Sequence, residues 1–128
     1  MDAGAVIRLV SDEIEVAAGH QLLAPTLLRS QVLSELHEAV VRGEIPAAVA
    51  RDRLARFGRL PIRLLGDGVL RRRAWDVADR LGWGPTYVAE YVALTELQAD
   101  AFVTLDAELA SRLEGIVTTA SIEALRRR

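Results

Sequence analysis

Two acidic residues stand where a parallel α/β protein would collect a ligand. Asp106 comes directly after the apolar segment Ala101–Thr104, and Asp2 lies at the very start of the chain. In sheets of parallel strands, ligands bind beyond the carboxyl ends of the strands. Carboxylates offer charged oxygen donors, so acids at this edge come first among the residues that could carry chemistry. Asp2 and Asp106 are therefore the first candidate site residues.

Other familiar site signatures are missing from the sequence. Neither the HExxH nor the GxSxG pattern occurs, although a dispersed Ser triad stays open as an alternative. Gly66–Asp67–Gly68 and Gly82–Trp83–Gly84 lack the spacing of a phosphate-binding loop and read as plain turns. His20 and His37 have no metal-ligand spacing around them, and we expect both on the surface.

Composition narrows the class of protein. The 128 residues carry a formal net charge of −2 with both signs scattered, so no global field draws the chain to nucleic acid or to an anionic membrane. Cysteine is absent, which excludes disulfides and thiolate metal sites. All 16 basic residues are Arg, typical of a GC-rich genome. We expect a single domain over residues 1–128, a cytoplasmic location and no membrane span.

Short apolar segments alternate with helical patterns and predict an α/β fold. Parallel strands joined by helices form a sheet covered on both faces, so we expect a three-layer α/β/α sandwich with a mostly parallel sheet. The expected strands are Gln21–Ala24, Leu60–Leu65, Ala101–Thr104 and Gly115–Thr118. The expected helices are Ala3–Val10, Thr26 to about Arg42, Ala48–Phe57, Val69–Leu81, Thr86–Gln98, Asp106–Leu113 and one capped by Ser121.

Four segments in order along the chain carry a resemblance to a known family. The stretch Thr86–Leu94, followed by Ala99–Asp106, is similar to a helix reading Y-D-A-x-Y-x-A-L and a strand reading x-x-V-T-x-D. Upstream, Asp2–Val6 is similar to D-A-S/G-x-L/V, and Ala24–Leu33 to A-P-x-L-x-x-x-E-V-L. These patterns are those of PIN domains of the VapC toxin family, which the chain resembles over nearly its whole length.

The resemblance implies an endoribonuclease that uses Mg²⁺ or Mn²⁺ held by converging carboxylates. It places metal ligands on Asp2 and Asp106, and Thr104 supplies a hydroxyl that can hold a neighbouring carboxylate. The family's other two acids fall on Gln31 and Val88, and Val offers no donor atom at all. The acidic site is therefore incomplete.

A shifted site would need another acid near one of the two lost positions. Glu35 follows Gln31 by one helical turn, and Glu90 and Asp100 lie close to Val88 in sequence. Glu35 or Glu90 is therefore the candidate for a relocated metal ligand, and a solvated surface carboxylate is the alternative role for each.

The family's first strand normally precedes the position of Asp2, and here only Met1 does. We therefore predict a truncated first strand, with a reading frame that begins a few codons upstream or with Met1 in place of a strand valine. Asp2 would otherwise sit on a frayed terminus.

Three readings of the function stay open. The chain is an active endoribonuclease toxin, a degenerate PIN domain that keeps only its partner surface, or an unrelated α/β binding domain. By resemblance, the partners are a small cognate antitoxin, an RNA substrate if the site is active, and a second copy in a homodimer.

Overall fold

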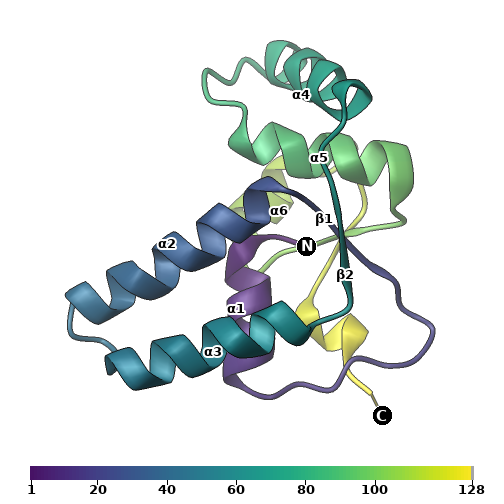
Figure 1. Ribbon diagram of the computed structural model, residues 1–128. Coiled ribbons are helices and arrows are strands. Elements are labelled where there is room, and N and C mark those ends of the chain that lie inside the picture. Colours follow the sequence, from purple (N-terminus) through teal and green to yellow (C-terminus); the bar gives the residue numbers. More distant parts are fainter. Residues whose placement is uncertain (128) are drawn as a thin grey trace.

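The structure is a computed structural model that describes residues 1–127, in which short parallel strands alternate with helices (Figure 1). The α/β class predicted from the sequence is confirmed, and it is shared with a solved structure reported below. The elements in chain order are α1 (Ala3–Ser11), β1 (Leu22–Pro25), α2 (Leu27–Val41), α3 (Ala47–Arg59), β2 (Ile62–Leu65), α4 (Gly68–Leu81), α5 (Tyr87–Gln98), β3 (Phe102–Val103), α6 (Ala107–Arg112), β4 (Thr119–Ala120) and the 3₁₀ helix η1 (Ile122–Leu125).

The strands pair in parallel, as predicted, but they form two separate pairs. β1 pairs with β2 from Leu22 opposite Ile62 to Pro25 opposite Leu65. β3 pairs with β4, with Phe102 opposite Thr119. Between the pairs lies the start of the chain, where the Met1 amino group donates to the Leu23 carbonyl at 3.4 Å and the Asp2 amide donates to the Val103 carbonyl at 3.2 Å. The chain start therefore connects the two pairs through one hydrogen bond on each side.

The end of the chain differs from the prediction. Residues 115–118, expected as a strand, form turns and a short irregular segment, because Gly115 takes a left-handed conformation with φ of 79° and both Ile116 and Val117 bond back to Leu113. The strand falls instead at Thr119–Ala120, where the chain first reaches β3. The helix expected after Ser121 is only the 3₁₀ turn η1.

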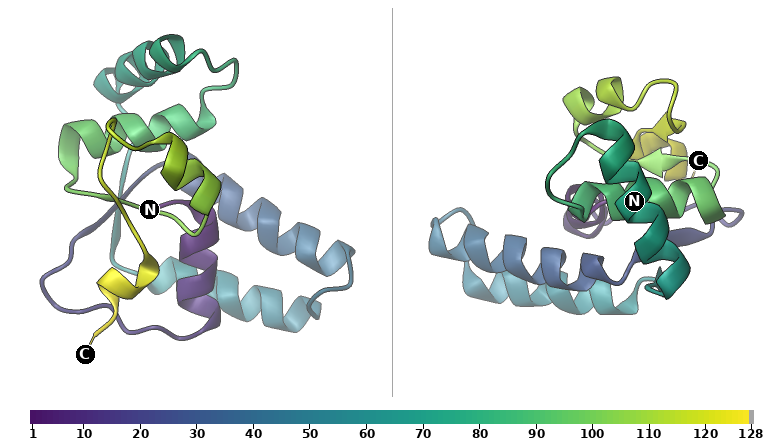
Figure 2. Two further views of the ribbon diagram at one scale, coloured as in Figure 1. Left: turned by 180° about the vertical axis from the view of Figure 1, so that it is seen from behind. Right: turned by 90° about the horizontal axis from the view of Figure 1, so that it is seen from above.

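Packing places α1 at the centre of the molecule. α1 buries five of its nine residues and packs against α2 and α3, which form a hairpin on one side (Figure 1). α4 packs on α5 and is the outermost helix, with α5 between it and the strands (Figure 2). Leu9, Leu28 and Phe102 are among the largest fully buried side chains of the single apolar core.

Three helices begin in the same way. Asp2, Asp67 and Asp106 each lie in the extended position before a helix, and each side chain accepts a hydrogen bond from the backbone N–H three residues later. Such caps satisfy otherwise unpaired N–H groups and stabilise a helix by about 1 kcal/mol. Asp2 and Asp106 are thus both structural caps and candidate site residues.

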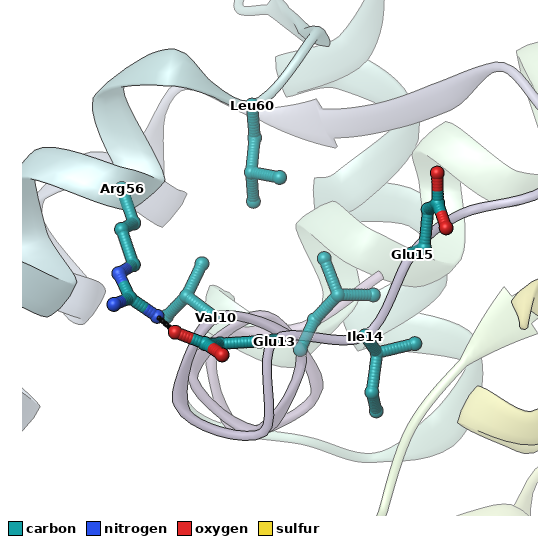
Figure 3. Close-up of a pocket in the computed structure, with 7 residues that line it drawn as sticks. Val10, Glu13, Ile14, Glu15, Arg56 and Leu60 are labelled. Carbon is teal, nitrogen blue, oxygen red and sulfur yellow. Dashed lines mark ion pairs between the residues drawn. The ribbon is translucent and has the colours of Figure 1, made fainter.

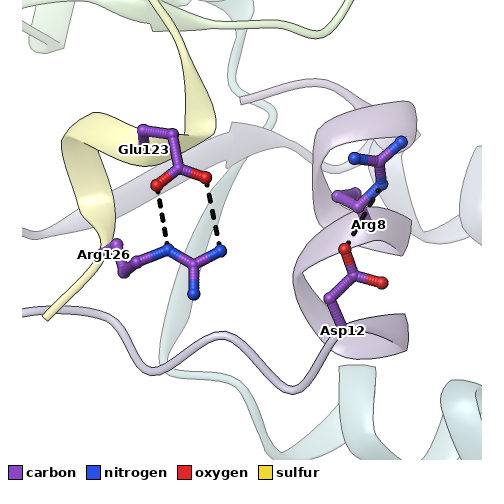
Figure 4. Close-up of polar contacts among 4 residues, drawn as sticks. All are labelled: Arg8, Asp12, Glu123 and Arg126. Carbon is purple, nitrogen blue, oxygen red and sulfur yellow. Dashed lines mark hydrogen bonds and ion pairs between the residues drawn. The ribbon is translucent and has the colours of Figure 1, made fainter.

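Ion pairs lie on the outside of the molecule. Figure 4 shows Arg126 with both carboxylate oxygens of Glu123, at 2.9 and 3.3 Å, and Arg8 beside Asp12 at 3.6 Å. Exposed pairs of this kind contribute between about 0 and 1 kcal/mol. The fold therefore depends on its apolar core and caps more than on its charges. Within residues 1–127, no helix combines the length and apolar character that crossing a membrane requires.

The close approach of two strand ends predicts a sensitive glycine. A Cβ on Gly66 would lie 2.7 Å from the Thr26 hydroxyl oxygen, where β1 and β2 both end. We expect Gly66→Ala to lower the free energy of unfolding by about 1–3 kcal/mol through this overlap. Urea denaturation measures the change. Gly58→Ala, in α3 with open space around it, should instead raise stability by up to about 1 kcal/mol.

The overlap explanation has its own check. Adding Thr26→Ala to Gly66→Ala removes the crowded atoms and should recover part of the lost stability. If the double variant were less stable than the sum of the two single changes, the overlap would not be the cause.

Candidate functional site

A small hollow of about 130 Å³ opens where α1, α2, α5 and α6 meet, beside the start of the chain. Figure 1 shows these helices around the N-terminus. The hollow combines acidic, amide and apolar side chains, and its lining consists of Asp2, Ala3, Gly4, Gln31, Glu35, Val88, Tyr91, Phe102 and Leu109. It thus gathers residues from both ends of the chain that the sequence had singled out.

Asp2 is held by hydrogen bonds on both of its carboxylate oxygens. Oδ1 accepts from the Ala5 amide at 3.0 Å, which is the helix cap of α1. Oδ2 accepts from the Thr104 hydroxyl at 2.5 Å. Each oxygen keeps a further lone pair, so the carboxylate is fixed in place and still able to bind a cation. The structure thus holds Asp2 on a defined edge of the fold.

Thr104 connects the two aspartates. Its buried hydroxyl donates to Asp2 and accepts from the Asp106 amide at 3.1 Å. Asp106 turns its own carboxylate to the Leu109 amide at 3.0 Å, is exposed, and does not line the hollow. The sequence prediction that Thr104 holds a carboxylate matches this geometry, whereas Asp106 lies at the rim of the site.

The carbonyl oxygen of Gln31 is already engaged by a hydrogen bond. The buried Tyr91 hydroxyl donates to its Oε1 at 2.5 Å, which leaves the amide N–H groups as the free polar edge. Tyr91 was not among the predicted site residues. The available signal was its spacing, because Tyr91 follows Val88 by three residues and so shares a helix face with it.

The charges in the hollow repel one another. Burial, and then the nearby Asp2 carboxylate, raise the pKa of Glu35. Burial also raises the pKa of Tyr91, with Asp2 as the next cause, which keeps its phenol protonated. The Asp2 carboxylate thus disfavours the ionised form of Glu35, and a cation bound beside the two side chains would favour it.

Of the relocated acids proposed from the sequence, the structure brings only Glu35 to the hollow. The pKa of Glu90 is raised by burial alone, and this residue does not line the hollow. Asp100 lines a different hollow, with His20, at the other end of the strands. Of the two alternatives, Glu35 and Glu90, Glu35 is therefore the one that lines the hollow with Asp2.

Val88 fills the wall of the hollow with an apolar side chain, as the sequence indicated. Within residues 1–127, no three His, Asp or Glu side chains lie close enough together to hold a metal ion. The groups of the hollow that can ligate a cation are the carboxylates of Asp2 and Glu35. Such a set fits a hydrated hard cation, because Mg²⁺ keeps several waters and commonly uses only one or two protein carboxylates.

Another hollow, between the end of α1 and α3, has a different character (Figure 3). Glu13 adopts a left-handed backbone with φ of 51°, and its carboxylate pairs with Arg56. Val10, Ile14 and Leu60 supply apolar lining. The paired charge and apolar walls suit packing between elements rather than chemistry. His20 and His37 are exposed, as predicted.

Comparisons with known proteins support the fold. The crystal structure of PAE2754 from Pyrobaculum aerophilum is similar, with a TM-score of 0.73 and 23% identity over 96% of this chain and 87% of that chain. At this identity the similarity shows the fold alone. The sequence matches no protein family model. It also matches none of the curated proteins.

The Thr104 hydroxyl should matter to stability because it satisfies two partners. Thr104→Val keeps the shape but removes the bonds to Asp2 and to the Asp106 amide, and should cost about 1–3 kcal/mol. Thr104→Ser keeps the hydroxyl and should cost about 1 kcal/mol for the lost methyl group. Chemical denaturation of both variants measures the difference. A Val variant as stable as the natural chain would show that the hydroxyl contributes nothing.

Glu35 should make stability depend on pH. Its folded pKa is raised, so the stabilising contribution of its neutral form is complete below pH 4.5 and is lost as pH rises through the folded pKa. Glu35→Gln should therefore gain stability relative to the natural chain as pH rises from about 4.5 to 7. Urea denaturation of both proteins at several pH values, in the presence of a chelator, gives the free energy of unfolding as a function of pH. If the two proteins showed the same dependence on pH, the expected repulsion would be contradicted.

Proposed function

We propose that this chain is a PIN-like, VapC-type toxin domain with a three-layer α/β/α arrangement, which cleaves RNA with Mg²⁺ or Mn²⁺ bound beside Asp2 and Glu35. One observation carries the proposal. The Thr104 hydroxyl joins Asp2 to the Asp106 segment across 102 residues of chain, and Asp2 lines the same hollow as Glu35. The order of the four motif segments and the α/β fold support it further.

The chemistry follows from the donors. A hard cation at this place would neutralise charge on a phosphate and lower the pKa of a water for attack on phosphorus. Asp2 and Glu35 would hold it, and Asp106 at the rim would orient bound water. The N–H groups of Gln31 face the same space and suit a phosphate oxygen rather than a cation. In this proposal Gln31 is a binding residue and not a metal ligand.

The resemblance to VapC toxins also implies the binding partners. A small cognate antitoxin would cover the acidic hollow, and a second copy of the chain would form a homodimer. Both belong to the proposal through the family alone.

A second candidate function has a specific observation in its favour. Val88 puts an apolar wall where the family's central aspartate would stand, and Tyr91 engages the Gln31 oxygen. Two carboxylates bind a divalent cation more weakly than four, because affinity rises with ligand charge. A domain that binds its antitoxin and cleaves nothing is the outcome this observation favours.

The nuclease proposal is tested with purified protein and labelled RNA. Cleavage of single-stranded and stem-loop RNA should require Mg²⁺ or Mn²⁺ and stop with chelator. Asp2→Asn and Glu35→Gln should each lower the rate of RNA cleavage about 10–100-fold, because each weakens cation binding. Asn keeps the cap of α1, so the fold should persist. The exposed Glu114→Gln, outside the hollow, serves as the matched control.

The Val88→Asp variant distinguishes the active nuclease from the degenerate domain. Calorimetry with Mn²⁺ should show tighter binding to this variant, because a third carboxylate then faces the hollow. No cleavage by the natural chain with any cation, together with cleavage by Val88→Asp, would establish the degenerate form. An unchanged isotherm would mean that Val88 does not stand at the family's aspartate position.

A further inference from the structure

Large apolar side chains remain exposed beside the acidic hollow. Tyr87 is 59% exposed at the first position of α5, and Val88, which lines the hollow, is 38% exposed. Leu105, directly before Asp106, is 42% exposed. Exposed aromatic and apolar side chains next to a site commonly mark a surface for ligand contact.

Helical spacing places Tyr87 on the same face of α5 as two residues that line the hollow, Val88 and Tyr91. Residues three and four apart share a helix face, so Tyr87 and Val88 both lie on the side that carries Tyr91. Tyr91 is buried at the floor beside Gln31, and Val88 forms the wall. Tyr87 stands one turn closer to the start of the helix, and helical side chains lean in that direction, away from the floor. Its ring is thus the outermost group on this face.

The Tyr87 ring has no internal role that would explain its position. Among residues 1–127 its hydroxyl makes no hydrogen bond to the protein, and its ring joins no aromatic pair. By contrast Tyr91 bonds to Gln31 and stacks on Phe102, with ring centres 6.0 Å apart. One tyrosine of this face is therefore structural, and the other is free for a ligand.

We infer that Tyr87 stacks on an unpaired base of single-stranded RNA, next to the phosphate that enters the hollow. This inference rests on the proposed function and adds a residue that binds the substrate. A base offers a flat face that an exposed ring binds whatever its identity, at about 1–3 kcal/mol per base. Bases within a duplex are already stacked and paired, so they cannot reach Tyr87.

Charge explains why stacking is needed at this place. Asp2 and Glu35 offset the charge of a divalent cation at the hollow, so beyond the one phosphate that the cation contacts it adds little attraction for a polynucleotide. The chain as a whole carries −2. Contacts to the bases must then supply affinity that a basic groove supplies elsewhere. An aromatic ring one helical turn from the acids is placed to do this.

The test uses four proteins: the natural chain, Tyr87→Ala, Tyr87→Phe and Trp75→Ala. Trp75 is 67% exposed on α4 and does not line the hollow, so it is a matched control for the loss of an exposed aromatic. Each protein is titrated into a labelled single-stranded RNA of about 12 nucleotides, and into a duplex of the same sequence, with Ca²⁺ as the cation. Fluorescence anisotropy reports the Kd.

Tyr87→Ala should weaken single-stranded binding roughly 5- to 100-fold, while Tyr87→Phe and Trp75→Ala leave it within about twofold. Duplex binding should not change. Where the natural chain cleaves, KM should rise in Tyr87→Ala and kcat should stay the same. An abasic nucleotide at the stacked position should weaken the natural chain as much as Tyr87→Ala does, and should not weaken that variant further.

Two failures are distinguishable. A chain that binds single-stranded RNA but never cleaves it would overturn the nuclease proposal and keep the role of Tyr87. A chain that cleaves RNA with Kd and KM unaffected by Tyr87→Ala would overturn the role of Tyr87 alone. Equal losses on single-stranded RNA and duplex, or no RNA binding with any cation, would also overturn it and leave the patch to a protein partner.

Discussion

The Asp2 carboxylate receives hydrogen bonds from its own helix and from Thr104, 102 residues away in sequence, and the arrangement of the site depends on it. One oxygen accepts from the Ala5 amide at the start of α1, and the other accepts from the Thr104 hydroxyl after β3. A charged acceptor makes stronger hydrogen bonds than a neutral one, and its rotamer is fixed by having both oxygens engaged. The same side chain therefore starts the central helix, ties it to the last strand pair and faces the hollow.

The position of Asp2 also explains how two short strand pairs act as one scaffold. Four strands of two to four residues are too short to be stable as isolated pairs. Met1 and Asp2 bond to β1 on one side and β3 on the other, and the apolar residues of α1 fill the core beside them. Loosening this junction would separate the carboxylates as well as the strands, so stability and site geometry are coupled.

Within the hollow, hydrogen bonding and charge have opposite consequences for cation binding. Tyr91 and Gln31 form a neutral pair that needs no cation, and Val88 adds an apolar wall. Asp2 and Glu35 leave negative charge that only protonation or a cation relieves. The result is a site with two carboxylates, which fits weak binding of a hydrated cation. The exposed ring of Tyr87 lies on the same helix face, where the proposed stacking on a base would take place.

Much of the fold could be read from local sequence. Hydrophobic periodicity and glycine or proline at the boundaries predicted α2, α4, α5 and the first three strands within a few residues, because these segments carry their own burial pattern. β4 was misplaced, since two residues have no period to detect and only the partner strand β3 selects them. The division into two strand pairs also escaped prediction. It arises because Met1 and Asp2 lie between β1 and β3 in the folded protein and bond to both.

The sequence by itself determined which residue types are available: an aspartate at its start, another after an apolar segment, a threonine that can hold a carboxylate, and Gln31 and Val88 in place of acids. Only the tertiary structure decided that Glu35, and not Glu90, joins Asp2, because helix faces are fixed by what they pack against and not by spacing alone. It alone also turned the Gln31 oxygen to Tyr91 and set Asp106 at the rim, since a hydrogen bond between distant residues exists only once the chain has folded.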